Sequence, residues 1–145
     1  MADQGRILAL DYGSKRMGLA LSDPLQILAT GAGTLESGPG LIDALRQIVE
    51  RELVVGVVVG MPYAPDGGLG AKGVEVEKFV RALRRALSVP VDTWDESHSS
   101  RDAVRTMIGS GMKRKKRREK ARVDEMAARI LLQEYLDNKP DRRSS

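Results

Sequence analysis

The sequence predicts an α/β fold in which a mixed sheet is flanked by helices, and three observations support this prediction. Residues 6–11 and 17–22 are apolar runs joined by a short connection around Gly13, which indicates an antiparallel hairpin. Residues 53–59 (LVVGVVV) form an unbroken run rich in β-branched residues, typical of a strand covered on both faces. Helical and strand patterns then alternate along the rest of the chain.

The remaining elements follow in chain order. We expect a third strand within residues 26–35, helices at about 41–51 and 72–87, a strand at 89–94, and helices at about 100–109 and 121–137. The helix at 100–109 begins with a capping box formed by Ser99 and Asp102. A loop opens at Gly60, directly after the β-branched strand, and long loops inside compact domains are usually functional.

Length and composition predict one domain. A chain of 145 residues with 41% hydrophobic residues can bury an ordinary core. We expect the domain to span residues 1–138, followed by a flexible tail at 139–145. The chain has no apolar stretch long enough to cross a bilayer, and its first residues lack a signal-peptide pattern. We therefore expect a soluble, cytoplasmic protein without a membrane partner.

The composition also excludes several kinds of site. The absence of cysteine excludes disulfides, thiolate zinc sites and cysteine nucleophiles. The single histidine, His98, excludes a two-histidine zinc protease motif, and its neighbouring serines do not supply the geometry of a Ser–His–Asp triad. We interpret His98 as an exposed loop residue, with a proton shuttle as the alternative. The loop after Gly60 lacks the P-loop pattern.

The net charge of +4 hides two opposed charge sets. Residues 113–122 (KRKKRREKAR) carry eight basic side chains and one acidic one, a charge of +7, which leaves −3 for the rest of the chain. Such runs are often simply solvated, but this one lies inside the chain. Because no aromatic residue interleaves it, we expect sequence-independent contacts to nucleic-acid phosphates. The predicted contacts are Lys113, Arg114, Lys115, Lys116, Arg117, Arg118, Lys120 and Arg122, with Lys15 and Arg16 in the hairpin turn as weaker candidates.

Three acidic residues stand where α/β sheets place their sites. Asp11 ends the first strand, Glu96 follows the last strand, and Asp124 opens the final helix, where Ala127 and Ala128 would allow close approach to the sheet. Converging carboxylates repel one another, and hard divalent cations such as Mg²⁺ relieve that repulsion. Two such ions can stabilise both the attacking and the leaving oxygen in phosphodiester cleavage. Taken singly, each acid could instead be a solvated or capping residue.

Four segments together resemble one protein family. They are LALDYGSKRMGLALSD (8–23), VVVGMPYAPDGG (57–68), DESHSS (95–100) and ARVDEMAARILLQEYLD (121–137). They resemble the YqgF, or RuvX, family of small ribonuclease H-like proteins, which are related to Holliday-junction resolvases. One departure is Ser97, which stands where the family usually has arginine.

The resemblance has structural and chemical implications. It implies a ribonuclease H-like, five-stranded mixed sheet with its first three strands antiparallel. It also implies phosphodiester hydrolysis dependent on one or two Mg²⁺ or Mn²⁺ ions, with Asp11, Glu96 and Asp124 as metal-binding catalytic acids. The implied function is a nuclease in 5′-end maturation of precursor 16S ribosomal RNA, with the ribosome as a further possible partner.

Other functions stay open beside this one. Resolution of branched DNA is the alternative enzyme reaction, and a non-catalytic RNA-binding ribosome-assembly factor is the alternative of a different class. The sequence allows a monomer or a homodimer. Residues 11–13 also resemble the phosphate loop of sugar-kinase and actin-type ATPases, but those proteins close two such domains around a nucleotide and this chain supplies one. Tyr12 and Tyr63 are candidate substrate contacts, whereas Phe79 and Trp94 are expected in the core.

Overall fold

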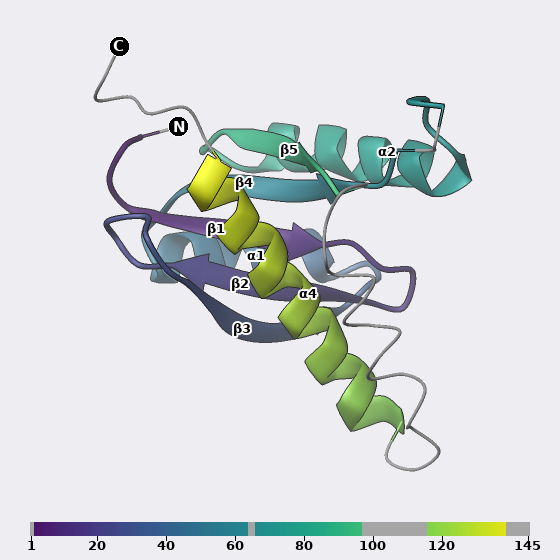
Figure 1. Cartoon of the computed structure of the whole chain (residues 1–145), viewed down its shortest axis with the longest axis horizontal. Coiled ribbons are helices and arrows are strands. Elements are labelled where there is room, and N and C mark those ends of the chain that lie inside the picture. Colours follow the sequence, from purple (N-terminus) through teal and green to yellow (C-terminus); the bar gives the residue numbers. More distant parts are fainter. Residues whose placement is uncertain (1, 64–65, 97–115, 139–145) are drawn as a thin grey trace.

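A five-stranded sheet in the order β3-β2-β1-β4-β5 forms the centre of the molecule (Figure 1). The computed structural model describes residues 2–63, 66–96 and 116–138, with only the backbone described for residues 116–118. The strands are β1 (Arg6–Asp11), β2 (Arg16–Ser22), β3 (Ala29–Glu36), β4 (Val54–Met61) and β5 (Val91–Asp95). The first three strands are antiparallel, and β4 and β5 run parallel to β1. The predicted mixed sheet is therefore confirmed.

Helices cover both faces of this sheet. They are α1 (Leu41–Arg51), α2 (Ala71–Ala86) and α4 (Lys116–Asn138). In Figure 1, α4 crosses the front of the sheet diagonally, and α1 lies behind it. None of the helices in the described ranges is long and apolar enough to cross a membrane.

Each face of the sheet has its own apolar core, and β1 contributes to both. Leu8 and Leu10 pack in the core with α1 and α2, whereas Ile7 and Ala9 pack with α4. Side chains alternate between the faces of a strand, so a strand buried on both sides must be apolar at consecutive positions. The same alternation places Asp11 on the α4 side of the sheet.

Element boundaries differ from the sequence prediction at three places that bear on the site. Arg16 was expected in the hairpin turn but is the first residue of β2, where it pairs with Glu36. Gly60 was expected to open a loop but continues β4, because it pairs with Trp94 of β5. Leu53 is not in the strand: it is 78% exposed and has a φ of 54° in the turn before β4.

The final helix begins earlier than predicted. It was expected at residue 121 and starts at Lys116, so the second half of the basic segment 113–122 is helical. Lysine, arginine and glutamate are good helix formers, which accounts for the extension. The predicted helix at 100–109 with its capping box, and the tail at 139–145, lie outside the described residues.

Candidate active site at the carboxyl end of the sheet

Asp11 is a buried carboxylate at the carboxyl end of β1. Asp11 is only 3% exposed to solvent. In the antiparallel pairing of β1 with β2, Asp11 lies directly opposite Gly18. A charged group is rarely buried to this extent without partners that stabilise it, so this position is typical of a functional carboxylate.

Asp124 reaches the same place from α4. A β-carbon built on Gly18 would lie 1.9 Å from the main-chain oxygen of Asp124, so the helix rests directly on β2 there. Ala127 and Ala128, one turn further along, are completely buried and keep the helix close to the sheet. The predicted role of these small residues is therefore confirmed. Gly18 is therefore next to both acids: it pairs with Asp11 in the sheet and contacts the backbone of Asp124 in the helix above it.

Arg16 neutralises Asp124 in this structure. Its Nε lies 2.7 Å from Asp124 Oδ2, and the two side chains are 21% and 22% exposed. The contact is an ion pair without hydrogen-bond alignment, because Nε is buried and has no hydrogen-bond partner within the described residues. Partial burial reduces screening by solvent, so the attraction is stronger than in an exposed surface pair.

Glu96 lies at the same edge of the sheet. It follows β5, and its backbone N–H donates a hydrogen bond of 3.2 Å to the Met61 carbonyl oxygen of β4. Trp94 packs against the core on the α4 side, so alternation along the strand places Glu96 on that side as well. β1 and β5 are parallel and separated only by β4, so their ends lie about 10 Å apart, two strand spacings.

The three acids share an edge and a face of the sheet without forming a closed cluster. Within the described ranges, no three histidine, cysteine or acidic side chains are grouped closely enough to hold a metal ion. The donor chemistry nevertheless fits a hard cation, because the candidate ligands are all carboxylate oxygens. Asp11 and Asp124 form the close part of this set, and Glu96 lies across β4 from them.

The side chain of Tyr12 packs on the opposite face of the sheet, with α2. Its ring centroid lies 5.0 Å from that of Phe79, and its hydroxyl donates a 2.8 Å hydrogen bond to Glu75 Oε1 of α2. Burial, followed by the hydrogen bond and negative charge of Glu75, raises the pKa of the Tyr12 phenol above 10.0. Tyr12 therefore fastens α2 to the end of β1. The predicted core position of Phe79 is confirmed, since it packs against that core.

The other aromatic predictions have separate outcomes. Trp94 packs edge to face on Tyr135, with ring centroids 5.7 Å apart, so it belongs to the core as predicted. Tyr63 is 37% exposed and forms an isolated β-bridge with Leu69 in the loop that follows β4.

Apart from Arg16, which is paired with Asp124, the predicted basic contacts divide into three groups. The side chains of Lys15, Lys120 and Arg122 are exposed. Lys116, Arg117 and Arg118 lie in the first turn of α4, where the structure describes only the backbone. Lys113, Arg114 and Lys115, like His98, lie outside the described residues. Phosphate binding by all of these residues stays a prediction.

A family model described as "RuvX: Holliday junction resolvase" matches residues 5–138, from the start of β1 to the end of α4. The chain belongs to the RuvX family. The resemblance predicted from the four sequence segments is thereby confirmed.

Two relatives of this RuvX-family chain carry the name "Putative pre-16S rRNA nuclease". The relative from Chlorobium luteolum is 47% identical over 138 residues, which cover 94% of this chain and 97% of the relative. The relative from Porphyromonas gingivalis is 45% identical over 139 residues, which cover 95% of this chain and 99% of the relative.

Two solved structures share the fold of this RuvX-family chain. Fowlpox virus resolvase, in a complex with its substrate Holliday junction DNA, matches with a TM-score of 0.56 at 12% identity and covers 94% of this chain and 99% of its own. Thermus thermophilus RuvC, in complex with a Holliday junction substrate, matches with a TM-score of 0.52 at 16% identity, covering 92% and 97%. These likenesses confirm the ribonuclease H-like fold.

Two features of this RuvX-family site escaped the sequence prediction. Gly18 had a readable signal, since a glycine inside an apolar strand often marks the close approach of another backbone. No local sequence pattern could have predicted the ion pair of Arg16 with Asp124, because the two residues are more than 100 positions apart in the sequence.

Proposed function

We propose that this protein is a metal-dependent nuclease that hydrolyses phosphodiester bonds, acting in the 5′-end maturation of precursor 16S ribosomal RNA. The observation that carries the proposal is that Asp11, which is buried, and Asp124 both adjoin Gly18 at the carboxyl end of β1, Asp11 by strand pairing and Asp124 by a backbone contact. Family membership and the names of the relatives support the same reaction. The cytoplasm is the compartment that this reaction implies, and the ribosome is its accompanying partner.

In this proposal, Asp11, Glu96 and Asp124 hold one or two Mg²⁺ or Mn²⁺ ions. A divalent cation bound there supplies charge neutralisation and activates water for attack on phosphorus. Asp11 is positioned by its pairing with Gly18 of β2 and by the pairing of the preceding residue, Leu10, with Val59 of β4. Asp124 is positioned by the contact of its backbone with Gly18.

The cationic residues position the substrate. Lys15 lies in the turn between Asp11 and β2, and the first turns of α4 precede Asp124 on the same helix. Their charges neutralise phosphates that flank the scissile bond, and such contacts fix the strand without reading its bases. Arg16 belongs to this group by charge, but in this structure its guanidinium forms an ion pair with Asp124.

Cleavage assays test the proposal with matched variants. Asp11→Asn removes a charge from the site, whereas Asp43→Asn removes one from the exposed side chain of α1 on the opposite face. With Mn²⁺ present, the wild type and Asp43→Asn should trim a precursor 16S RNA fragment, and Asp11→Asn should be at least about 100-fold slower. Full activity of Asp11→Asn would contradict the proposal.

Resolution of Holliday junctions is the second candidate, favoured by the two structural neighbours. Symmetric cleavage of a four-way junction needs two active sites, which a homodimer with two-fold symmetry supplies. Sedimentation at assay concentration, together with cleavage of a synthetic junction, tests this function. A monomer that cuts RNA and leaves junctions intact would exclude it.

A non-catalytic RNA-binding ribosome-assembly factor is the candidate of a different class. The exposed basic residues of α4 favour it, because phosphate contacts alone give salt-dependent RNA binding. Calorimetric titration with Mn²⁺ separates the classes. A metal-binding signal that disappears in Asp11→Asn supports the nuclease, whereas RNA binding indifferent to metal and to Asp11→Asn supports the assembly factor.

A further inference from the structure

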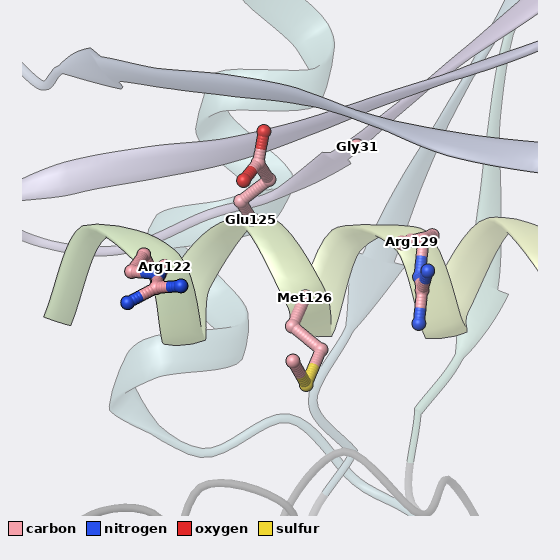
Figure 2. A pocket seen from close by; sticks show the side chains of 5 residues that line it. All are labelled: Gly31, Arg122, Glu125, Met126 and Arg129. Carbon is pink, nitrogen blue, oxygen red and sulfur yellow. The ribbon is translucent and has the colours of Figure 1, made fainter. Parts of the chain in front are cut away.

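A hollow lies between α4 and the edge strand β3, directly beside the candidate active site. It has a volume of about 320 Å³ and is lined by Gly31 of β3 and by Arg122, Glu125, Met126 and Arg129 of α4. Figure 2 shows Glu125 pointing toward the strands, with Arg122 and Arg129 on either side of it along the helix. The volume falls at the lower end of the range for small-molecule sites, about 300–1,000 Å³.

The carboxylate of Glu125 is held in a fixed position in the hollow. Its Oε2 accepts a 2.5 Å hydrogen bond from the backbone N–H of Gly33. A β-carbon on Gly31 would lie 2.8 Å from Glu125 Cγ, so the absence of a side chain at Gly31 makes room for the glutamate. A carboxylate offers about four acceptor positions. The bond to Gly33 therefore leaves Glu125 with capacity for donors from a ligand.

Two unpaired positive charges flank this carboxylate. Arg122 and Arg129 are exposed, and in the described part of the chain neither has a carboxylate within 4.0 Å. They are seven residues apart on one helix, which separates their backbones by about 10 Å along the axis. The guanidinium groups are thus free to bind anions at the two ends of the hollow.

A nucleotide matches this combination of charges better than a bare phosphate does. A phosphate alone would be repelled by Glu125, whereas a nucleotide carries an anion for arginine and base N–H groups for the carboxylate. Guanine presents two parallel donors, N1–H and the N2 amino group, which fit the two oxygens of one carboxylate. Such edges are available only in unpaired nucleotides, which sequence-specific RNA-binding proteins commonly recognise.

We propose that this hollow binds one unpaired guanosine of the substrate strand, with the base edge on Glu125 and the flanking phosphates on Arg122 and Arg129. The proposal rests on the nucleic-acid substrate of the proposed function and extends it to base recognition. Glu125 follows Asp124 in the sequence, so the bound nucleotide lies next to the proposed site of cleavage. Sequence preference would therefore come from Glu125, whereas the basic residues contact phosphates.

Fluorescence anisotropy with two labelled single-stranded RNAs tests this proposal. One 12-nucleotide RNA carries guanosine at every third position, and the other carries inosine there, which lacks only the N2 amino group. Binding is measured in EDTA, so no cleavage occurs and no metal is needed. The wild type should bind the guanosine RNA about tenfold more tightly, and Glu125→Gln should lose that preference.

Arginine variants test the phosphate contacts in the same assay. Arg129→Ala should weaken binding of both RNAs alike and reduce the salt dependence by about 0.7, the value for one phosphate contact on a single strand. Arg85→Ala is the matched control, because Arg85 is an exposed arginine of α2 on the opposite face of the sheet. Circular dichroism verifies that each variant is folded.

The possible results separate this proposal from the nuclease proposal. Equal affinity of the wild type for both RNAs would overturn base recognition, and equal behaviour of Arg129→Ala and Arg85→Ala would overturn the phosphate contact. A preference for guanosine in a protein that cleaves neither the precursor 16S RNA fragment nor the synthetic junction with Mn²⁺ would support guanosine binding and contradict the nuclease proposal. Cleavage without a preference for guanosine would support the nuclease proposal and contradict guanosine binding in the hollow.

Discussion

Gly18 and Asp124 are in direct backbone contact, and this contact joins the last helix to the strand beside Asp11. A β-carbon at Gly18 would lie 1.9 Å from the Asp124 carbonyl oxygen, a distance that no packed structure tolerates. The glycine therefore determines how closely α4 approaches the sheet. Stability and the alignment of the candidate acids depend on the same contact.

Gly18→Ala should destabilise the protein by about 3 kcal/mol, because α4 must move away from β2 to admit a methyl group. The shift also displaces Asp124, so cleavage activity should fall further than the loss of folded protein explains. Urea unfolding and activity assays measure the two effects. Gly40→Ala is the control, since a β-carbon there meets nothing within 4 Å, and it should cost less than about 1 kcal/mol.

Arg16→Gln should strengthen Mn²⁺ binding about fivefold to tenfold. The guanidinium neutralises Asp124 in this structure, so a cation would compete with it for the same carboxylate. Isothermal titration calorimetry measures the affinity without any cleavage step. Arg46→Gln, which breaks an exposed ion pair with Asp43, should leave the affinity unchanged. Weaker binding in Arg16→Gln would instead mean that Arg16 is needed to orient Asp124.

The turn between β2 and β3 should lose stability in acid. The carboxylate of Asp23 accepts hydrogen bonds from the backbone N–H groups of Leu25, Ile27 and Leu28. These bonds, that of Leu28 first, lower the pKa of Asp23 below 3.8. The stabilisation is therefore complete above pH 3.8 and is lost as the pH falls through the lowered pKa.

Asp23→Asn should accordingly be less stable than the wild type by about 1 kcal/mol at pH 7. The difference should shrink below pH 3.8, because the wild-type carboxyl is then protonated as well. Urea unfolding at a series of pH values measures this convergence. A difference that stayed constant down to pH 2 would show that the charge of Asp23 has no part in the effect.

Tyr12 should ionise later than an ordinary tyrosine. Partial burial of its phenol, followed by the hydrogen bond that it donates to Glu75, raises its pKa above 10.0. The folded state therefore loses stability as the pH rises above 10.0, where the phenol of the unfolded chain ionises first. Ultraviolet titration should show that Glu75→Gln lowers this pKa, whereas Glu77→Gln, which changes a half-buried glutamate of α2 that pairs with Arg81, should not. An unchanged titration in Glu75→Gln would contradict this account.

The order and kind of the elements could be predicted from the sequence because local patterns encode them. Strands buried on both faces are continuously apolar, as in residues 54–59, and amphipathic helices repeat their apolar positions with helical spacing. The position of Asp11 at the end of such a strand was visible for the same reason. Boundaries such as Leu53 and Gly60 were wrong by one or two residues, because pairing with neighbouring strands determines where a strand ends.

Only the tertiary structure decided how the charged residues are paired. The sequence shows no partner for Arg16, but in the structure it lies at the first position of β2 and pairs with Asp124 of α4. No sequence pattern singles out Glu125, but packing against Gly31 and a hydrogen bond from Gly33 fix it between two arginines. Periodicity along one chain segment determines which face a residue occupies. The partner on that face comes from a distant segment, and only the packing of α4 across β2 and β3 brings the two together.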